Sequence, residues 1–172
     1  TLVGNTAGAL RGGAIFGQDD LDLKLTNSIV WGNQLVPGQG SQIVINDGAF
    51  DLTYTILEGG VGGIEVLGPI TVGAGVTSRD PPLMDPDGSD DQPGTADDQL
   101  RWQAGSRAID AGNNGALPKD VGDLDEDGDT SELLPLDYNR DTRLLDDSHT
   151  MDVGQGTAPI VDIGAHEFQR GG

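Results

Sequence analysis

Acidic residues at alternate positions around glycines form two loops in the second half of the chain, at residues 85–98 and 123–132. Aspartates at every second position turn several carboxylates toward one centre, and calcium takes roughly six to eight oxygen ligands at about 2.3–2.6 Å. Without a counter-ion, so many like charges in a short loop would repel one another strongly. The spacing therefore predicts calcium sites, with ligands from Asp85, Asp87, Asp90, Asp97 and Asp98 in the first loop and from Asp123, Asp125, Asp127 and Asp129 in the second.

The second loop matches part of a helix-loop-helix calcium loop. Acids occupy its first, third and fifth positions, and Gly128 occupies the sixth. Its twelfth position is Leu134, so the usual closing bidentate carboxylate is missing and Glu132 or Asp137 would have to replace it. The alternative for both loops is a solvated acidic face or a disordered acidic linker, which is what runs of charge usually are.

Composition restricts the class of protein. A chain of 172 residues is long enough for one domain with a real core, and its 28 glycines and 4% aromatic residues suit short strands joined by tight turns. The net charge of −20 argues against nucleic acid and anionic membrane surfaces as partners. No apolar run reaches transmembrane length, so we expect no membrane insertion. The absence of cysteine excludes disulfides and thiolate sites, and reliance on calcium favours a location outside the cell.

The first half of the chain repeats itself. Residues 23–33 align with residues 50–60 at an offset of 27, and residues 1–5 align with residues 29–33 at an offset of 28. A period in the twenties with alternating strands and no helix is typical of a β-solenoid, in which each period is one coil. We therefore predict an all-β fold with a parallel β-helix of about three coils at residues 1–78. Residues 79–172 would form an Asp-rich, loop-rich, calcium-binding C-terminal cap.

The repeat also predicts which side chains meet. Asn5 and Asn33 fall at the same turn of successive coils, where they either hydrogen-bond along the axis or serve as ordinary turn residues. Gly60 holds that place in the next coil, so an asparagine ladder would end there. We expect the following apolar residues to point mostly into the coil: Val3, Ile15, Ile29, Ile43, Leu52 and Ile56.

Three ordered motifs in the second half resemble a known family. The segment 105–112, Gly-Ser-Arg-Ala-Ile-Asp-Ala-Gly, is similar to the "GSPAIDAG" motif of secreted bacterial right-handed parallel β-helix proteins with a choice-of-anchor Q domain. Residues 79–88 resemble the "DPLFVDPDG" segment of that family, and residues 161–168 resemble its closing "VDIGAYE". The resemblance implies a right-handed parallel β-helix and a secreted, extracellular or cell-surface location. It implies no common reaction.

The chain departs from the family pattern in places. Pro82 is an additional proline, and His166 stands where the family has tyrosine. Residues 137–143 resemble the family's "DLDGNPR" loop but lack its second aspartate and its glycine. These losses weaken a metal site in that loop.

Parallel β-helices include pectate lyases and polygalacturonases, so catalysis must be considered. Asp19 and Asp20 offer paired carboxylates, as glycoside hydrolysis requires. The Asn-x-Asp, His-Gly and Arg-x-Lys partners of polygalacturonases are absent, and the coils offer few basic residues for lyase chemistry. We therefore expect no enzymatic activity.

A solenoid exposes unpaired strand edges at its two ends, and these edges suggest a function. We expect the acidic cap to cover one end, and an upstream β-helix segment or a second copy of the chain to pair with the other. Head-to-tail pairing of copies that does not close into a ring produces a fibre. The sequence thus predicts an extracellular, calcium-stabilised structural or adhesive protein, and it becomes a filament subunit if a second copy rather than an upstream segment pairs with the open end. The alternative is a carbohydrate-binding or polysaccharide-cleaving module of a larger secreted enzyme, which exposed aromatics at Trp31 or Tyr54 would favour.

Overall fold

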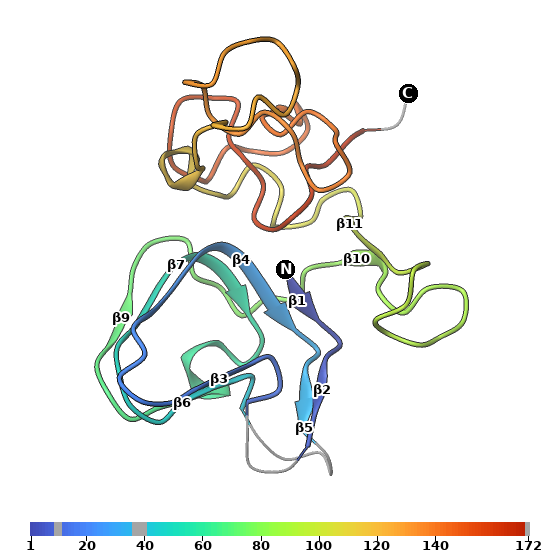
Figure 1. Ribbon diagram of the computed structural model, residues 1–172. Helices are drawn as coiled ribbons and strands as arrows, with labels where there is room; N and C mark the ends of the chain where they lie inside the picture. The colour runs from blue at the N-terminus through green and yellow to red at the C-terminus, as the bar shows by residue number, and fades with distance from the viewer. Residues whose placement is uncertain (9–11, 36–40, 171–172) are drawn as a thin grey trace.

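The computed structural model describes residues 1–8, 12–35 and 41–170, and most of its regular structure is short β-strands (Figure 1). In the described residues, helix is limited to the short 3-10 turns η1 (Gly60–Gly63) and η2 (Asn114–Ala116). The all-β class is therefore confirmed. The strands are β1 (Leu2–Val3), β2 (Thr6–Ala7), β3 (Ile15–Gly17), β4 (Leu23–Trp31), β5 (Gln34–Leu35), β6 (Ile43–Ile45), β7 (Phe50–Leu57), β8 (Ile64–Val66), β9 (Ile70–Val72), β10 (Leu83–Asp85) and β11 (Gln99–Trp102).

Strands from successive repeats pair in parallel. One sheet has the order β1-β4-β7-β9, a second has β3-β6-β8, and a third has β2-β5. Leu2 pairs with Val30, and Leu23 pairs with Phe50, so neighbouring strands are offset by the 28 and 27 residues of the sequence repeat. The register of the repeat is therefore confirmed. The last parallel contact of the β1-β4-β7-β9 sheet is an isolated bridge between Ile56 and Thr77, and a further parallel bridge, between Asn113 and Gln155, lies within the C-terminal region.

A hydrophobic core lies between the four-stranded β1-β4-β7-β9 sheet, which we call the long sheet, and the β3-β6-β8 sheet. Ile43 and Leu52 are buried in it and Ile15 packs against it, as predicted. Burying an aliphatic side chain of this size stabilises the fold by roughly 1.5–3 kcal/mol. The buried members of this core are Val30, Ile43, Ile45, Phe50, Leu52, Leu57 and Ile64.

A second core lies on the outer side of the long sheet, and it corrects part of the prediction. Val3, Ile29 and Ile56 do not belong to the core between the sheets. Instead, Ile29 and Ile56 are buried in a cluster with residues of the C-terminal region, and Val3 packs against that cluster. The buried members of this second core are Ile29, Ile56, Leu83, Trp102, Ala108, Ile109, Ala111 and Ile163.

Left-handed residues within β4 and β7 explain the change of side. Asn27 has a φ of 47° and Tyr54 a φ of 45°, and the regular strand register skips both. An extra residue in a strand reverses the alternation of the side chains that follow it. Both residues also hold the C-terminal region. The Asn27 side chain exchanges two hydrogen bonds with the backbone of Asn113, at 2.8 and 2.9 Å, and the Tyr54 hydroxyl donates to Gln155 at 2.9 Å.

Polar side chains connect successive repeats at one turn. Asn5 Nδ2 donates to Asn33 Oδ1 at 2.8 Å, which decides for the asparagine ladder between the two alternatives that the sequence left open. The network continues where the sequence predicted an end, because Asn33 Nδ2 donates to Gln42 and Gln42 Nε2 donates to Glu58, both at 2.9 Å. Glu58 also accepts the N–H of Gly32 at 2.8 Å, so an acidic residue replaces the missing third asparagine.

The C-terminal region lies along the flank of the long sheet, as Figure 1 and the second core show. The sequence predicted that this region covers an open end of the repeat. Its contacts with Ile29 and Ile56 place it against the outer side of the long sheet instead. β10 and β11 form an antiparallel pair that carries the first acidic loop at its tip. Residues 103–170 have little regular structure and are held by backbone hydrogen bonds between loops and by side-chain hydrogen bonds to the backbone.

Candidate metal centre

The second acidic loop is closed at its base by backbone pairing. Lys119 and Leu133 form an antiparallel bridge, and the N–H of Asp120 donates to the carbonyl of Glu132 at 3.1 Å. Within the loop, Asp123 and Glu126 have positive φ values of 50° and 64°. Such left-handed residues curl the backbone tightly. The residues between 120 and 132 therefore form a compact loop with both ends fixed.

This loop gathers carboxylates into two overlapping groups. One carboxylate oxygen from each of Asp123, Asp125 and Asp127 lies within 4.8 Å of the others. The same holds for Asp120, Asp125 and Glu132, so Asp125 belongs to both groups. Such spacing fits carboxylates around one hard cation, whose oxygen ligands lie at about 2.3–2.6 Å from calcium. We call these five residues the 120–132 site.

Two buried oxygens of the 120–132 site lack hydrogen-bond partners among the residues that the structure describes. Asp120 is 1% exposed, and its Oδ2 accepts the N–H of Leu124 at 2.7 Å while its Oδ1 accepts nothing. Oε1 of Glu132 is also buried without a partner. Burial raises the pKa of Glu132, and the charges of Asp125, Asp127, Asp129 and Asp120 raise it further. Buried carboxylate oxygens without donors are costly unless a cation compensates them.

Asp129, the fourth predicted ligand of the second loop, lies outside both groups. Its Oδ1 accepts the N–H and the hydroxyl of Ser131 at 2.8 and 2.6 Å, and these bonds lower its pKa. Of the two residues considered as the closing ligand, the fold brings Glu132 to the site. Asp137 is used elsewhere, accepting three backbone N–H groups, from Asn139, Asp141 and Glu167.

The first acidic loop arranges its carboxylates differently. Asp97 accepts the N–H and hydroxyl of Ser89 at 2.8 and 2.6 Å, and these bonds lower its pKa. Asp98 accepts the N–H of Gly94 at 2.6 Å, and Asp90 accepts the N–H of Gln92 at 3.0 Å. These acids therefore act as turn acceptors for their own loop.

Asp85 and Asp87 lie at the base of the first loop, near β10. Desolvation raises the pKa of Asp85, with the charge of Asp87 and a hydrogen bond to it acting in the same direction. Among the residues that the structure describes, the acidic groups able to share one ion contain no member of this loop. Of the nine predicted ligands, Asp123, Asp125 and Asp127 are thus the ones that the fold brings into a group able to share one ion.

Asp120 is a candidate ligand that the sequence pattern did not indicate. It precedes the alternating acids by three residues, outside the pattern that identified the loop. Its position becomes significant because the pairing of Lys119 with Leu133 returns the chain to it. Acids placed symmetrically outside an acidic loop, here Asp120 and Glu132, are the signal that could have identified it.

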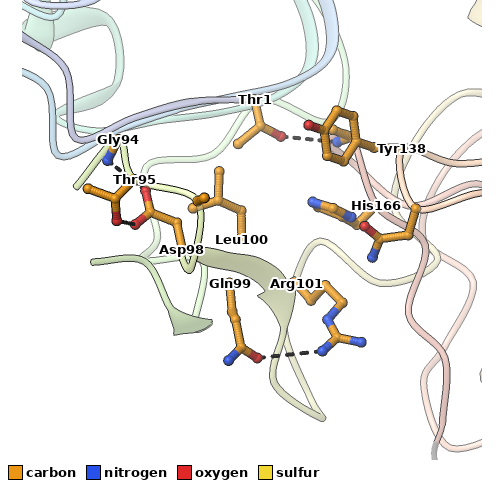
Figure 2. A pocket seen from close by; sticks show the side chains of 12 residues that line it. Thr1, Gly94, Thr95, Asp98, Gln99, Leu100, Arg101, Tyr138 and His166 are labelled. Atoms are coloured by element: carbon orange, nitrogen blue, oxygen red, sulfur yellow. Dashed lines mark hydrogen bonds between the residues drawn. The ribbon is translucent and has the colours of Figure 1, made fainter. Parts of the chain in front are cut away.

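A pocket of about 790 Å³ lies between the first acidic loop and the C-terminal region (Figure 2). Tyr138 at this pocket is 78% exposed and stands edge-on to His166, with ring centroids 5.4 Å apart. Burial lowers the pKa of His166, so its imidazole is neutral at physiological pH. Asp98 and Arg101 add charged groups of opposite sign to the lining.

The residues considered for catalysis or for glycan contact lie in ordinary structural positions. Asp19 and Asp20 are exposed and left-handed, with φ values of 60° and 63°, as turn residues are. Tyr54 is buried, and Trp31 packs against the second core. Neither coil aromatic therefore forms an exposed platform.

Comparison with protein-family models, curated proteins and solved structures finds no match for this chain. In the part of the chain that the structure describes, no helix has the length and hydropathy needed to cross a membrane. The geometry defines a β-rich protein with stacked parallel strands and a carboxylate-rich loop suited to a hard cation. Its function must be inferred from these features.

Proposed function

We propose that this chain is an extracellular, calcium-stabilised structural or adhesive protein whose first 78 residues are coils of a right-handed parallel β-helix. The observation that carries the calcium assignment is the 120–132 site, with five acids in one loop and a buried, unpartnered Asp120 oxygen. Calcium fits this site because hard oxygen donors select hard cations, and a loop of this kind tolerates calcium's variable geometry.

The β-helix assignment has separate support. In each of three parallel sheets the first strand pairs keep the 27- or 28-residue spacing of the sequence repeat, whereas β8 and β9 follow at 21 and 20 residues. The motifs at 105–112 and 161–168 resemble those of secreted β-helix proteins. Right-handed connection is the general rule for parallel strands in one sheet. A secreted location agrees with weak calcium sites, which millimolar calcium outside the cell would fill.

The structural role follows from the edges of the sheets. β1 and β2 are the first strands of their sheets and have no strand partner on their outer side among the described residues. Strand edges of this kind accept another strand through backbone hydrogen bonds. We assign this edge to self-association, with one copy adding its last coil to the first coil of the next. An upstream β-helix segment of the same protein is the other occupant that fits.

Thermal unfolding in calcium and in chelator tests the calcium role. At a calcium concentration of 100 times Kd, binding to the native state adds about 2.7 kcal/mol to the free energy of unfolding. For a chain of this size that corresponds to a rise in Tm of roughly 5–11 °C. The Asp125→Asn variant should lose this rise, since Asp125 belongs to both carboxylate groups. Asp51→Asn removes an exposed acid from β7 and should keep it. An equal Tm with and without calcium would refute the proposal.

Carbohydrate binding is the second candidate, and one observation favours it. Tyr138 offers an exposed ring in the pocket of Figure 2, which Gln99 and Arg101 also line, and sugars stack on such rings. The test is retention of the protein on immobilised acidic and neutral polysaccharides in calcium-containing buffer. Retention that Tyr138→Ala abolishes would support this candidate over the structural one.

A further inference from the structure

A third acidic cluster lies outside both loops. One carboxylate oxygen from each of Asp110, Asp146 and Asp152 lies within 4.8 Å of the others. Asp110 belongs to the 105–112 motif, whereas Asp146 and Asp152 flank a turn 36 or more residues later in the chain. The carbonyl of Asp110 accepts the N–H groups of Val153 and Gly154 at 3.0 and 3.1 Å, which fixes the distant loop beside it. The cluster is therefore formed by the tertiary fold.

The Asp110 carboxylate is buried and has no hydrogen-bond partner among the described residues. The residue is 0% exposed, and neither Oδ1 nor Oδ2 accepts a hydrogen bond from that part of the chain. Its φ of 51° adds the cost of a left-handed conformation. Burial, together with the charges of Asp152, Asp146 and Asp147, raises the pKa of Asp110 to about 6. The nearby N–H of Asp147 favours the charged form of the Asp110 carboxylate, although the two groups do not have the geometry of a hydrogen bond.

The adjacent Asp147 shows how the same loop satisfies a carboxylate that is used for structure. Asp147 is also buried, but it accepts the Thr150 hydroxyl at 2.7 Å. Arg170 donates to both of its oxygens, at 2.8 and 2.7 Å. Within the described residues, every ion pair of the chain involves Asp147 or Asp137, so no basic side chain compensates the third cluster.

The chemistry of the cluster identifies its ligand class. Three carboxylates supply hard oxygen donors and no nitrogen or sulfur, which suits calcium better than zinc or copper. Asp146 and Asp152 are exposed, so an ion can enter from solvent and keep water as its remaining ligands. An ion there would compensate the buried Asp110 and remove the repulsion between the three acids.

We propose that Asp110, Asp146 and Asp152 bind a calcium ion that fastens the 146–152 loop to the 105–112 motif. This site shares no residue with the 120–132 site, so either can exist without the other. The bound ion holds the loop beside Asp110 and thereby protects the amides of Val153 and Gly154. The ion would then hold the C-terminal region together at a point where the three carboxylates otherwise repel one another.

Calcium stoichiometry of the metal-stripped protein tests the proposal by calorimetric titration. The wild type should bind calcium at this site and at the 120–132 site. Asp110→Asn should lose one ion per chain, and so should the double variant Asp146→Asn/Asp152→Asn, whose exposed positions spare the fold. The control variant Asp19→Asn/Asp20→Asn removes the same number of charges from an exposed turn and should bind calcium as the wild type does.

Hydrogen exchange provides the second measurement. Calcium should slow exchange at Val153 and Gly154 at least tenfold in the wild type and in Asp125→Asn, and in neither cluster variant. Unchanged stoichiometry in both cluster variants would overturn the proposal, as would exchange that does not respond to calcium. A single ion that only Asp125→Asn removes would overturn it while leaving the 120–132 site intact. A single ion that only the cluster variants remove would support it and refute the 120–132 site.

Discussion

The backbone N–H of Asp110 donates to Oδ1 of Asp162 at 2.7 Å, although 52 residues separate the two. The other oxygen of Asp162 accepts the N–H of Phe168 at 2.7 Å. Backbone bonds from Gly112 to Val161 and from Ile163 to Ala108 run beside this contact. The motifs at 105–112 and 161–168 are therefore neighbours in space, and Asp162 acts as a buried acceptor between them. Although the two motifs are far apart in the sequence, they form one hydrogen-bonded unit.

Replacing Asp162 should destabilise the fold strongly. Asp162→Ala leaves the N–H groups of Asp110 and Phe168 unpaired, and each buried unsatisfied donor costs about 1–3 kcal/mol. Asp162→Asn keeps one acceptor oxygen and should lose less. Urea unfolding with a common m-value measures both. Asp51→Ala, an exposed site on β7, should change the free energy of unfolding by less than about 0.5 kcal/mol. A loss from Asp162→Ala as small as that control would refute the buried-acceptor role.

Stability without calcium should fall as the pH rises, because of Glu167. Burial raises the pKa of Glu167, and the nearby charge of Asp162 raises it further. The folded protein therefore binds this proton more tightly than the unfolded chain does. The resulting stability is complete below the unfolded pKa of about 4.5 and is lost as the pH rises through the folded pKa, by up to about 1.4 kcal/mol per pH unit.

The Glu167→Gln variant isolates that contribution. It keeps an oxygen for the N–H of Leu145 or Asp162 and removes the titration. In chelator, the free energy of unfolding should decline less steeply from pH 5 to pH 8 for the variant than for the wild type. Parallel pH profiles for the two proteins would contradict the assignment.

Asn33 should contribute more to stability than Asn5. Asn33 is buried, and its Oδ1 accepts two hydrogen bonds from Asn5 while its Nδ2 donates to Leu2 and Gln42. Asn33→Ala leaves the Leu2 carbonyl and the Gln42 amide oxygen without that donor, at a cost of about 1–3 kcal/mol. Asn5 is exposed, so water can replace its side chain and Asn5→Ala should cost less. Chemical unfolding of the two variants compares them directly, and equal losses would contradict this ranking.

The sequence predicted the register of the fold better than the direction of its side chains. The offsets of 27 and 28 residues appear as the strand pairings of β4 with β7 and of β1 with β4. The direction of Ile29 and Ile56 was predicted wrongly because it depends on the left-handed Asn27 and Tyr54. Simple alternation gives no sign of such a residue, least of all when it is a tyrosine within a strand.

The sites were predictable only where their residues are local in sequence. Asp123, Asp125 and Asp127 were identified because a single loop carries them, and the fold brings them together. Asp110, Asp146 and Asp152 were not, because loops without regular structure bring them into contact. The first acidic loop shows the converse. Its spacing resembles a calcium loop, yet the N–H and O–H groups of Ser89, Gly94 and Thr95 use the carboxylates of Asp97 and Asp98.

The open edge of β1 and β2 gives the final prediction, which concerns assembly. Gln34 N–H donates to the Asn5 carbonyl at 2.8 Å, so in a parallel pair the N–H of the next residue, Thr6, faces the open edge. Thr6→Pro removes that outward donor and leaves the pairing with β5 intact. Thr6→Ala keeps the donor and is the matched control.

At micromolar concentration in calcium, the wild type and Thr6→Ala should form polymers visible by negative-stain electron microscopy, and Thr6→Pro should remain monomeric by light scattering. Circular dichroism would establish that the proline variant is folded. Backbone pairing through this edge predicts a ribbon of copies stacked along one axis, with successive strands about 4.8 Å apart across the junction. A folded wild type that stays monomeric would refute self-association. Polymers that persist in Thr6→Pro would place the contact on another surface, because a proline at this position cannot donate across the edge.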